Sequence, residues 1–252
     1  MSERALILAA HGSNVEPAVN LFVRRLVSRI GATGAFGTVT AAFHRGRPKL
    51  NTVLDQLSAG DVTVVPFMSS EGYFCNTVLR GRLAEHARSS SMRLRQTVPV
   101  GTHRGIPRLV ERRVRRLINV HGCDARATTL AVVGHGTERH QHSRDTTLSL
   151  VEALRRSGVV AEVIPAFLDD VPLVETLLDH CTYRALLTVP FFMTAGPHAT
   201  RDIPARLGLA PHKDAAAPLC GRVNGRFVII DEPVGTYPEL VDIVLDLARG
   251  AP

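Results

Sequence analysis

The sequence of 252 residues predicts an α/β protein built from two tandem domains, each with a mainly parallel, Rossmann-type sheet. Two observations lead to this prediction. Short runs of β-branched and apolar residues alternate with amphipathic segments, a pattern typical of right-handed βαβ units. Similar phrases also recur at a constant distance along the chain, which indicates an internal duplication and two domains related by a pseudo-twofold axis.

The duplication is visible as three pairs of segments with one common offset of 124 residues. They are ALILAAHGS (5–13) with TLAVVGHGT (129–137), AAFHRGRPKLNTVLDQL (41–57) with PAFLDDVPLVETLLDHC (165–181), and VTVVPFMSSEGYF (62–74) with LLTVPFFMTAGPH (186–198). A fourth pair, PVGTH (99–103) and PVGTY (233–237), is offset by 134 residues, which predicts a ten-residue insertion around HKDAAAPLCG in the second half. We therefore expect one domain at residues 1–122 and another at 123–252.

Each half contains four expected strands. These are ALILAA, TVTAAF, DVTVVPF and LRQTVPV in the first half, and TTLAVV, AEVIPAF, ALLTVPFF and RFVIID in the second. A helix is expected from Pro17 to Gly31, because the apolar residues Val19, Val23, Leu26 and Ile30 share one face of it. Leu148, Val151 and Leu154 are expected to line the corresponding helix of the second half, which ends at Ser157-Gly158.

The composition predicts a globular protein of the cytoplasm. Hydrophobic residues make up 45% of the chain and charged residues 21%, and no apolar run approaches the roughly 20 residues of a membrane span. The N-terminus has no signal-peptide cleavage pattern. Four cysteines (Cys75, Cys123, Cys181 and Cys220) lie far apart without a CxxC motif, so we expect free thiols in a reducing compartment.

Charge is unevenly divided along the sequence. Residues 1–120 hold 18 Lys and Arg against 7 Asp and Glu, whereas residues 121–252 hold 12 against 16. No nucleic-acid motif accompanies the scattered arginines, and aromatic residues are only 5% of the chain, so no nucleic-acid partner is expected. The pattern suits a small polyanionic ligand between a basic half and an acidic half.

Polar residues follow the expected strands, at the edge where parallel α/β sheets bind their ligands. His11 and His135 each follow the first strand of their half, and His44 follows the second strand of the first half. In the second half, Asp169 and Asp170 end the second strand. His198 closes the loop after the third strand, where the first half carries Phe74 instead.

These histidines suit two kinds of chemistry, metal binding and phosphoryl transfer. Neutral imidazole is a good ligand for Fe²⁺, Co²⁺, Ni²⁺ and Zn²⁺, and a site with two protein ligands leaves positions open for exchange. His135 and His198 would then form a metal site. Alternatively, a histidine after the first strand could be a phosphoryl acceptor, as in histidine phosphatases, but those enzymes use Arg-His-Gly. This chain has Ala-His-Gly at 10–12 and Gly-His-Gly at 134–136.

Taken in order, these motifs resemble the CbiX/SirB-type class II chelatases. The shared features are a first strand ending in AHGS or GHGT, acidic residues and a proline after the second strand, and VPFF-x-x-AG-x-H-x-x-x-DIP after the third. The ending PVGTYPELVDIVLDLA is also similar to the family's last strand and helix. The resemblance covers essentially the whole chain twice and implies two chelatase-like domains.

The resemblance implies a lyase-class enzyme that inserts a divalent metal, cobalt or iron, into sirohydrochlorin without ATP, in cobalamin or siroheme biosynthesis. No cofactor would be permanently bound, since Co²⁺, Fe²⁺ or Ni²⁺ is a substrate. His135 and His198 would bind the metal and accept pyrrole protons, and Asp169 and Asp170 would relay them. In the first half, Phe74 and His44-Arg45 replace the expected histidine and acidic pair, which implies an incomplete metal site there.

Sirohydrochlorin carries eight carboxylates, so arginines are expected to bind it. The candidate arginines are Arg45, Arg47, Arg80 and Arg82, and His11 and His44 are further substrate-binding candidates. The expected partners are therefore the tetrapyrrole and the metal, with no membrane, for a monomer or homodimer. A non-catalytic tetrapyrrole or metal carrier descended from a chelatase is the alternative.

Overall fold

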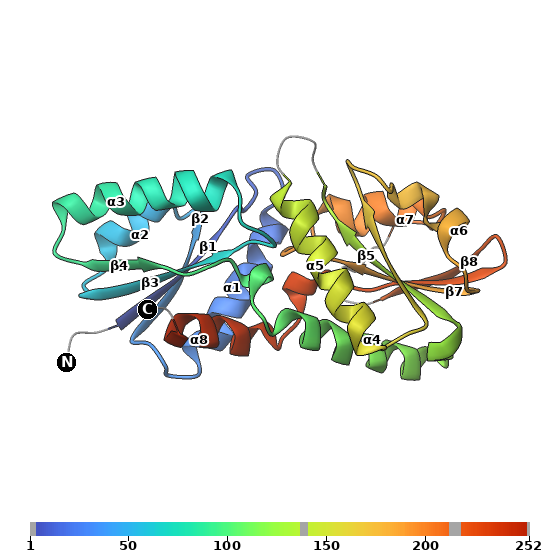
Figure 1. The fold of residues 1–252 in the computed structure, drawn as a ribbon. Helices are drawn as coiled ribbons and strands as arrows, with labels where there is room; N and C mark the ends of the chain where they lie inside the picture. Colours follow the sequence, from blue (N-terminus) through green and yellow to red (C-terminus); the bar gives the residue numbers. More distant parts are fainter. Residues whose placement is uncertain (1–3, 137–140, 212–217, 251–252) are drawn as a thin grey trace. The chain divides into compact units, whose positions relative to one another are not determined.

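The chain forms two compact units in a computed structural model that describes residues 4–136, 141–211 and 218–250. The first unit comprises Met1–His103 together with Pro238–Pro252, and the second comprises Arg104–Tyr237. Each unit is a parallel-dominated α/β sheet with helices on both faces (Figure 1). The predicted fold class is confirmed, because each half of the sequence supplies one such sheet.

The first unit holds a four-stranded parallel sheet in the order β2-β1-β3-β4. Its strands are β1 (Arg4–Ala10), β2 (Thr38–Phe43), β3 (Asp61–Phe67) and β4 (Arg93–Gln96). Helices α2 (Leu50–Gln56) and α3 (Arg80–Ser89) cover one face, and α1 (Pro17–Gly31) and α8 (Leu240–Gly250) cover the other (Figure 1). A π-helical turn, η1 (Phe74–Leu79), leads into α3, and a 3-10 turn, η2 (Val100–Thr102), follows β4.

The second unit holds a five-stranded sheet in the order β6-β5-β7-β9-β8. Its strands are β5 (Thr128–Gly134), β6 (Glu162–Phe167), β7 (Ala185–Pro190), β8 (Leu219–Val223) and β9 (Arg226–Ile230). Helices α6 (Leu177–His180) and α7 (Ile203–Arg206) lie on one face, and α4 (Ile106–His121) and α5 (His142–Ser157) on the other (Figure 1). The shorter helical turns are η3 (Ala125–Ala127), η4 (Val174–Thr176), η5 (His198–Asp202) and η6 (Val234–Thr236).

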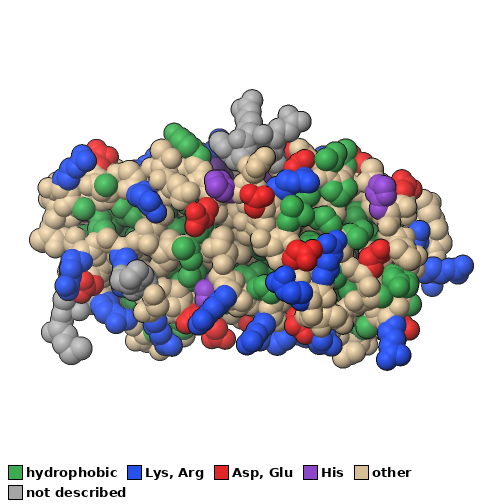
Figure 2. Space-filling model, in the orientation of Figure 1, with side chains coloured by type: hydrophobic (Ala, Val, Ile, Leu, Met, Phe, Trp, Pro, Cys, Tyr) green, Lys and Arg blue, Asp and Glu red, His purple; other side chains and the backbone are tan. Residues whose placement is uncertain are grey.

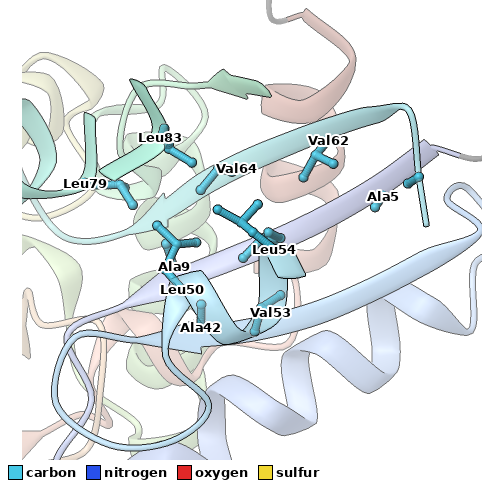
Figure 3. Packing of buried hydrophobic residues seen from close by; sticks show 12 residues of the cluster. Ala5, Ala9, Ala42, Leu50, Val53, Leu54, Val62, Val64, Leu79 and Leu83 are labelled. Carbon is cyan, nitrogen blue, oxygen red and sulfur yellow. The ribbon is translucent and has the colours of Figure 1, made fainter. Parts of the chain in front are cut away.

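Each sheet buries its strands on both faces, which explains their nearly continuous apolar sequences. In β1 every residue from Ala5 to Ala10 is buried, and all seven residues of β5 are buried. Figure 3 shows one layer of the first unit, where Leu50, Val53 and Leu54 of α2 pack on alternate residues of β1 and β3. These rigid strands fix the positions of the loops that follow them.

The duplication recurs in the hydrogen bonds of the loops. Phe43 N donates to Pro48 O over 2.9 Å, and the matched Phe167 N donates to Pro172 O over 2.9 Å. After the third strand, Gly101 N donates to Met68 O, as Gly235 N does to Phe192 O. The sequence offsets of 124 and 134 residues therefore relate positions that also make the same backbone contacts.

The compact units differ from the sequence repeats because the last helix of each repeat packs in the other unit. Helix α4 precedes residue 122 in the sequence but packs within the second unit, and α8 ends the second repeat but packs against α1 and β3 of the first unit. Arg113 of α4 holds it there by binding the carboxylate of Asp231, just after β9, at 2.7 Å. The hydroxyl of buried Tyr237 donates to the same carboxylate at 2.6 Å.

Because of this exchange, the two compact units do not have the charge difference that the two sequence halves have. The first unit holds 13 Lys and Arg against 9 Asp and Glu, and the second holds 17 against 14. The arginines of α4 account for the change, since they belong to the first half by sequence and to the second unit by packing. On the face drawn in Figure 2, acidic side chains lie among the basic ones. The expectation of a basic and an acidic domain is therefore wrong.

A few local expectations also change. The expected strand LRQTVPV is shorter in the structure. Strand β4 ends at Gln96, and Val100–Thr102 form the turn η2 instead. Leu148 is only half-buried, and Leu150 takes its expected place in the core of α5. The antiparallel strand β8 was not predicted and lies just past residues 212–217 of the insertion, which are outside the described part. All four cysteines are free thiols, as predicted.

Among the described residues, no helix combines the length and the apolar character needed to cross a membrane. The longest helices, α4 and α5, have 16 residues each and carry charged residues along one face.

We predict that Arg113→Met destabilises the second unit by about 3–5 kcal/mol, because it leaves the buried charge of Asp231 without its cation. The Asp231 side chain is 0% exposed. The free energy of unfolding from urea denaturation measures the effect. The control is Arg115→Met, which breaks an exposed i,i+4 pair with Glu111 and should cost less than about 1 kcal/mol. Equal effects of the two substitutions would contradict this assignment.

Candidate functional site

The predicted site residues of the second unit lie on neighbouring strands of its sheet. His135 follows β5, Asp169 and Asp170 follow β6, and His198 begins η5 after β7. Strands β6, β5 and β7 are adjacent in the sheet, so their carboxyl ends bring these residues to one edge. The imidazole rings of His135 and His198 have their centroids 5.1 Å apart and stand nearly perpendicular, at 85°.

A glycine after His135 allows this approach. Gly136 has a φ of +67°, and a Cβ on it would come within 2.6 Å of the Asp170 Cβ and 2.9 Å of the Phe167 Cβ. Only glycine fits both the backbone conformation and the space. The loop after β6 therefore packs directly on the loop after β5, and Asp169 N donates a hydrogen bond to His135 O at 3.0 Å.

Each imidazole of the pair has a carboxylate beside its Nδ1 atom. In His135, Nδ1 lies 3.3 Å from Asp169 Oδ2 and 2.9 Å from Gly136 O. In His198, Nδ1 lies 2.6 Å from Asp202 Oδ2. A neutral ring that donates its Nδ1–H to such an acceptor keeps its lone pair on Nε2, the form in which histidine binds metals. Both rings can thus offer Nε2 to a ligand.

Asp202 was not predicted from the sequence, although GPHATRDIP contains the signal. In the motif H-x-x-x-D, the histidine and the aspartate are four residues apart, so one helical turn places them on the same face. The π-helical turn η5 provides that turn, running from His198 to Asp202.

Asp170 lies beside the pair but is committed to other contacts. Its Oδ2 accepts a hydrogen bond from Arg144 at 2.8 Å, and its Oδ1 accepts one from Val171 N at 2.7 Å. Arg144 itself lies over the ring of Phe167, 5.0 Å from its centroid. The structure therefore gives Asp170 a role in holding the loop after β6, while Asp169 is the carboxylate that contacts His135.

The histidine pair is accessible and leaves room for other ligands. The side chains of His135 and His198 are 44% and 53% exposed. Within the described part of the chain, no group of three or more His, Cys, Asp or Glu side chains is arranged to hold a metal ion. A pair of imidazoles leaves most coordination positions of a divalent ion for water or substrate.

The corresponding edge of the first unit is built differently. The His11 ring lies 5.3 Å from the His44 ring, and the Phe74 ring lies 5.0 Å from that of His44. Phe74 begins η1, just as His198 begins η5. Gly12, with a φ of +68°, repeats the turn seen at Gly136. The scaffold is thus preserved, while an aromatic side chain occupies the position of the second histidine.

Both histidines of the first unit favour the neutral form. Burial, then the neighbouring His44 and Arg45, lower the pKa of His11. Burial, then Arg82, Lys49 and Arg45, lower the pKa of His44. The Nδ1 atom of His44 is buried and has no hydrogen-bond partner among the described residues. This edge therefore combines nearby cations with imidazoles that favour the neutral form.

Of the four arginines predicted to bind substrate, the structure places two beside His44. Arg45 follows it directly, and Arg82 of α3 acts on its pKa. Arg47 and Arg80 are exposed, and Arg47 contributes its carbonyl oxygen to a hydrogen bond from Arg24. No contact of the Arg47 or Arg80 guanidinium with the histidines is seen in the described residues.

Both halves of the chain match the same family of known proteins. The CbiX family model matches residues 5–117 and again residues 129–251. A protein of Halobacterium salinarum, described as a probable sirohydrochlorin cobaltochelatase, is 31% identical over 270 residues, covering 98% of this chain and 91% of its own.

Solved structures share the fold. One is CbiX, described as the terminal enzyme for biosynthesis of siroheme in denitrifying bacteria, with a TM-score of 0.74, 20% identity and 99% of both chains covered. Another is SirB from Bacillus subtilis with Fe³⁺, with a TM-score of 0.75, 17% identity, and 98% of this chain and 94% of that one covered.

We predict that Asp202→Asn weakens Co²⁺ binding by about 10–100-fold, the usual effect of removing the carboxylate that orients a ligating histidine. Titration of the metal-free protein with Co²⁺, followed by calorimetry, measures the affinity. Asp179→Asn is the matched control, since Asp179 is an exposed acid of the same unit. An unchanged affinity in Asp202→Asn would show that Asp202 does not support His198.

The lowered pKa values of His11 and His44 predict a loss of stability in mild acid. A histidine whose pKa is lower in the folded state binds its proton more weakly there than when unfolded, so protonation favours unfolding. The stabilising effect is complete above the unfolded pKa of about 6.5 and is lost as the pH falls toward the folded value. The variant His11→Gln/His44→Gln should therefore lose less unfolding free energy than the natural chain between about pH 7 and 5. The same pH dependence of the unfolding free energy in the variant and in the natural chain would contradict this prediction.

Proposed function

The chain belongs to the CbiX family, and we propose that it is a chelatase that inserts a divalent metal ion into sirohydrochlorin. The observation that carries the proposal is the pair of imidazoles at one edge of the second sheet, each with a carboxylate at Nδ1. Support for the substrate comes from the Halobacterium salinarum relative, which is described as a probable sirohydrochlorin cobaltochelatase and aligns with nearly the whole chain.

The reaction exchanges two pyrrole protons for one M²⁺ ion, and the second unit offers one histidine–aspartate pair for each proton. In the first stage, Nε2 of His135 and of His198 would hold the ion while it exchanges water for pyrrole nitrogens. Once the ion moves to the macrocycle, each Nε2 has its lone pair again and can accept a proton. The carboxylates of Asp169 and Asp202 would stabilise the two imidazolium ions through their Nδ1–H groups.

This scheme assigns different roles to the two aspartates after β6. Asp169 faces the imidazole and takes part in proton transfer, whereas Asp170 holds Arg144 and the loop. In the first unit, the cations Arg45 and Arg82 near His44 are the proposed contacts for substrate carboxylates, because guanidinium pairs well with carboxylate. His11 and His44 are proposed to line that surface of the first unit.

We further propose cobalt and iron as the two physiological candidates. Cobalt is supported by the Halobacterium salinarum relative, described as a probable cobaltochelatase, and iron by the CbiX structure, described as an enzyme of siroheme biosynthesis. The ligand set of two imidazoles accepts either ion. A comparison of the insertion rates with Co²⁺ and with Fe²⁺ would distinguish a cobalamin pathway from a siroheme pathway.

We predict that His135→Ala and His198→Ala each lower the catalysed rate of metal insertion at least about 100-fold, while the fold is retained because both side chains are exposed. The assay is the absorbance change of sirohydrochlorin with Co²⁺, and separately with Fe²⁺, under anaerobic conditions. His180→Ala, which changes an exposed histidine of the same unit, is the control.

The outcomes of this assay separate the proposal from its alternatives. A rate above the protein-free blank that depends on both histidines supports the enzyme. Stoichiometric binding of the tetrapyrrole without acceleration would instead identify a carrier. Full activity in both alanine variants would place the chemistry outside this histidine pair.

A further inference from the structure

Helix α4 carries a row of arginines on its exposed side. Arg108, Arg112 and Arg116 follow one another at intervals of four residues, and all three are exposed. Successive members lie about 6 Å apart along the helix axis, because an α-helix rises 1.5 Å per residue. The same interval leads on to Val120, an apolar side chain that is 68% exposed. The three arginines form the basic row of α4.

The acids that neighbour this helix bind other arginines. Arg115 pairs with Glu111 at 2.8 Å, and Arg113 binds the buried carboxylate of Asp231. No ion pair of the basic row is seen in the described part of the chain. Like charges four residues apart on a helix repel each other and destabilise it. The repulsion within the basic row is therefore not offset by any described acid, which leaves the row open to an acidic partner.

The packing of the helix does not require these arginines, as the corresponding helix of the other repeat shows. The offset of 134 residues that aligns PVGTH with PVGTY also aligns Arg108 with Asp242 and Arg112 with Asp246. Both helices bury the apolar residues beside these positions, which are Leu109 and Val110 in α4, and Ile243 and Val244 in α8. The two helices thus share a buried face and carry opposite charges on their exposed sides.

Helix α8 therefore presents an acidic row that matches the basic row of α4. Asp242 and Asp246 are both exposed. Asp246 contacts His103 through Oδ2 at 3.0 Å, but its side chain is still 54% exposed. The two carboxylates have the same four-residue spacing as the arginines. Two helices lying side by side would bring two guanidinium groups opposite two carboxylates at once, and these groups pair well.

We propose that the protein self-associates through these two surfaces, with the basic row of α4 in one copy against the acidic row of α8 in a second copy. The equal spacing and opposite sign of the two rows favour a second copy as the partner. A nucleic acid is a poorer fit, because the row has no aromatic side chain on which bases would stack. Arginine is enriched in protein interfaces, and Val120 adds an apolar contact at the end of the row.

Sedimentation equilibrium of the metal-free full chain measures the mass of the associating species. At about 0.05 M salt, we expect the mass to rise with protein concentration from the 27.3 kDa of one chain toward twice that value, with a dissociation constant in the micromolar range. At about 0.5 M salt the protein should sediment as a single chain, because salt screens interactions between exposed charges.

Charge reversal of one row at a time tests the pairing. Arg108→Glu/Arg112→Glu and Asp242→Arg/Asp246→Arg should each weaken self-association at least about tenfold, because like charges then face each other. Asp242→Arg alone leaves the contact of Asp246 with His103 intact and should act in the same direction. Arg25→Glu/Arg29→Glu, at two exposed arginines of α1 with the same spacing, is the control and should leave the dissociation constant unchanged.

An equimolar mixture of the two double row variants should form the dimer again, because the reversed row of each is complementary to the reversed row of the other. Their formal net charges are +3 and +11, which are the +7 of the natural chain less four and plus four. Since both variants remain positively charged, attraction between whole molecules does not explain the recovery.

Weaker self-association of both row variants, recovered in their mixture, would support the proposal. A natural chain that keeps the mass of one chain at low salt and about 100 µM protein would overturn it. So would a mixture of the row variants that stays monomeric, or an effect of the α1 control as large as that of the row variants.

Discussion

The left-handed turn at Gly136 is the constraint on which the arrangement of the site depends. Any side chain there would collide with Asp170 and Phe167, so only glycine lets the loop after β6 approach the end of β5. That approach sets the backbone hydrogen bond from Asp169 to His135 and places their side chains in contact. The sheet then brings His198 to the same edge from the other side of β5. A pair of imidazoles with separate carboxylates follows from this packing.

The two units show how one scaffold can support different chemistry. The turn at Gly12 repeats that at Gly136, and the matched backbone hydrogen bonds recur. At the edge that carries the histidines, the first unit has Phe74 where the second has His198, and it has His44 with nearby cations. These changes alter side chains at strand ends and leave the strands intact. Loops after rigid strands tolerate such changes, because core packing does not depend on them.

Much of the fold and part of the site could be predicted from the sequence, for reasons that differ between elements. Strands such as β1 and β5 were recognised because burial on both faces requires continuous apolar runs, and α1 because Pro17 and its apolar stripe mark it. His135 and His198 could be paired through the repeat. The exchange of α4 and α8 could not, since an apolar helical face does not reveal which sheet it covers. The distinct roles of Asp169 and Asp170 depend on Arg144, a contact made 26 residues away in sequence.

Reciprocal double variants can show whether metal insertion depends on the histidine–aspartate pairs of the second unit. Single-turnover insertion of Co²⁺ into sirohydrochlorin would be timed for His11→Ala/His44→Ala and for His135→Ala/His198→Ala. We expect the first variant still to insert the metal once substrate is saturating, and the second to be no faster than the protein-free reaction. Insertion that survives in the second variant and is lost in the first would instead place the reaction in the first unit.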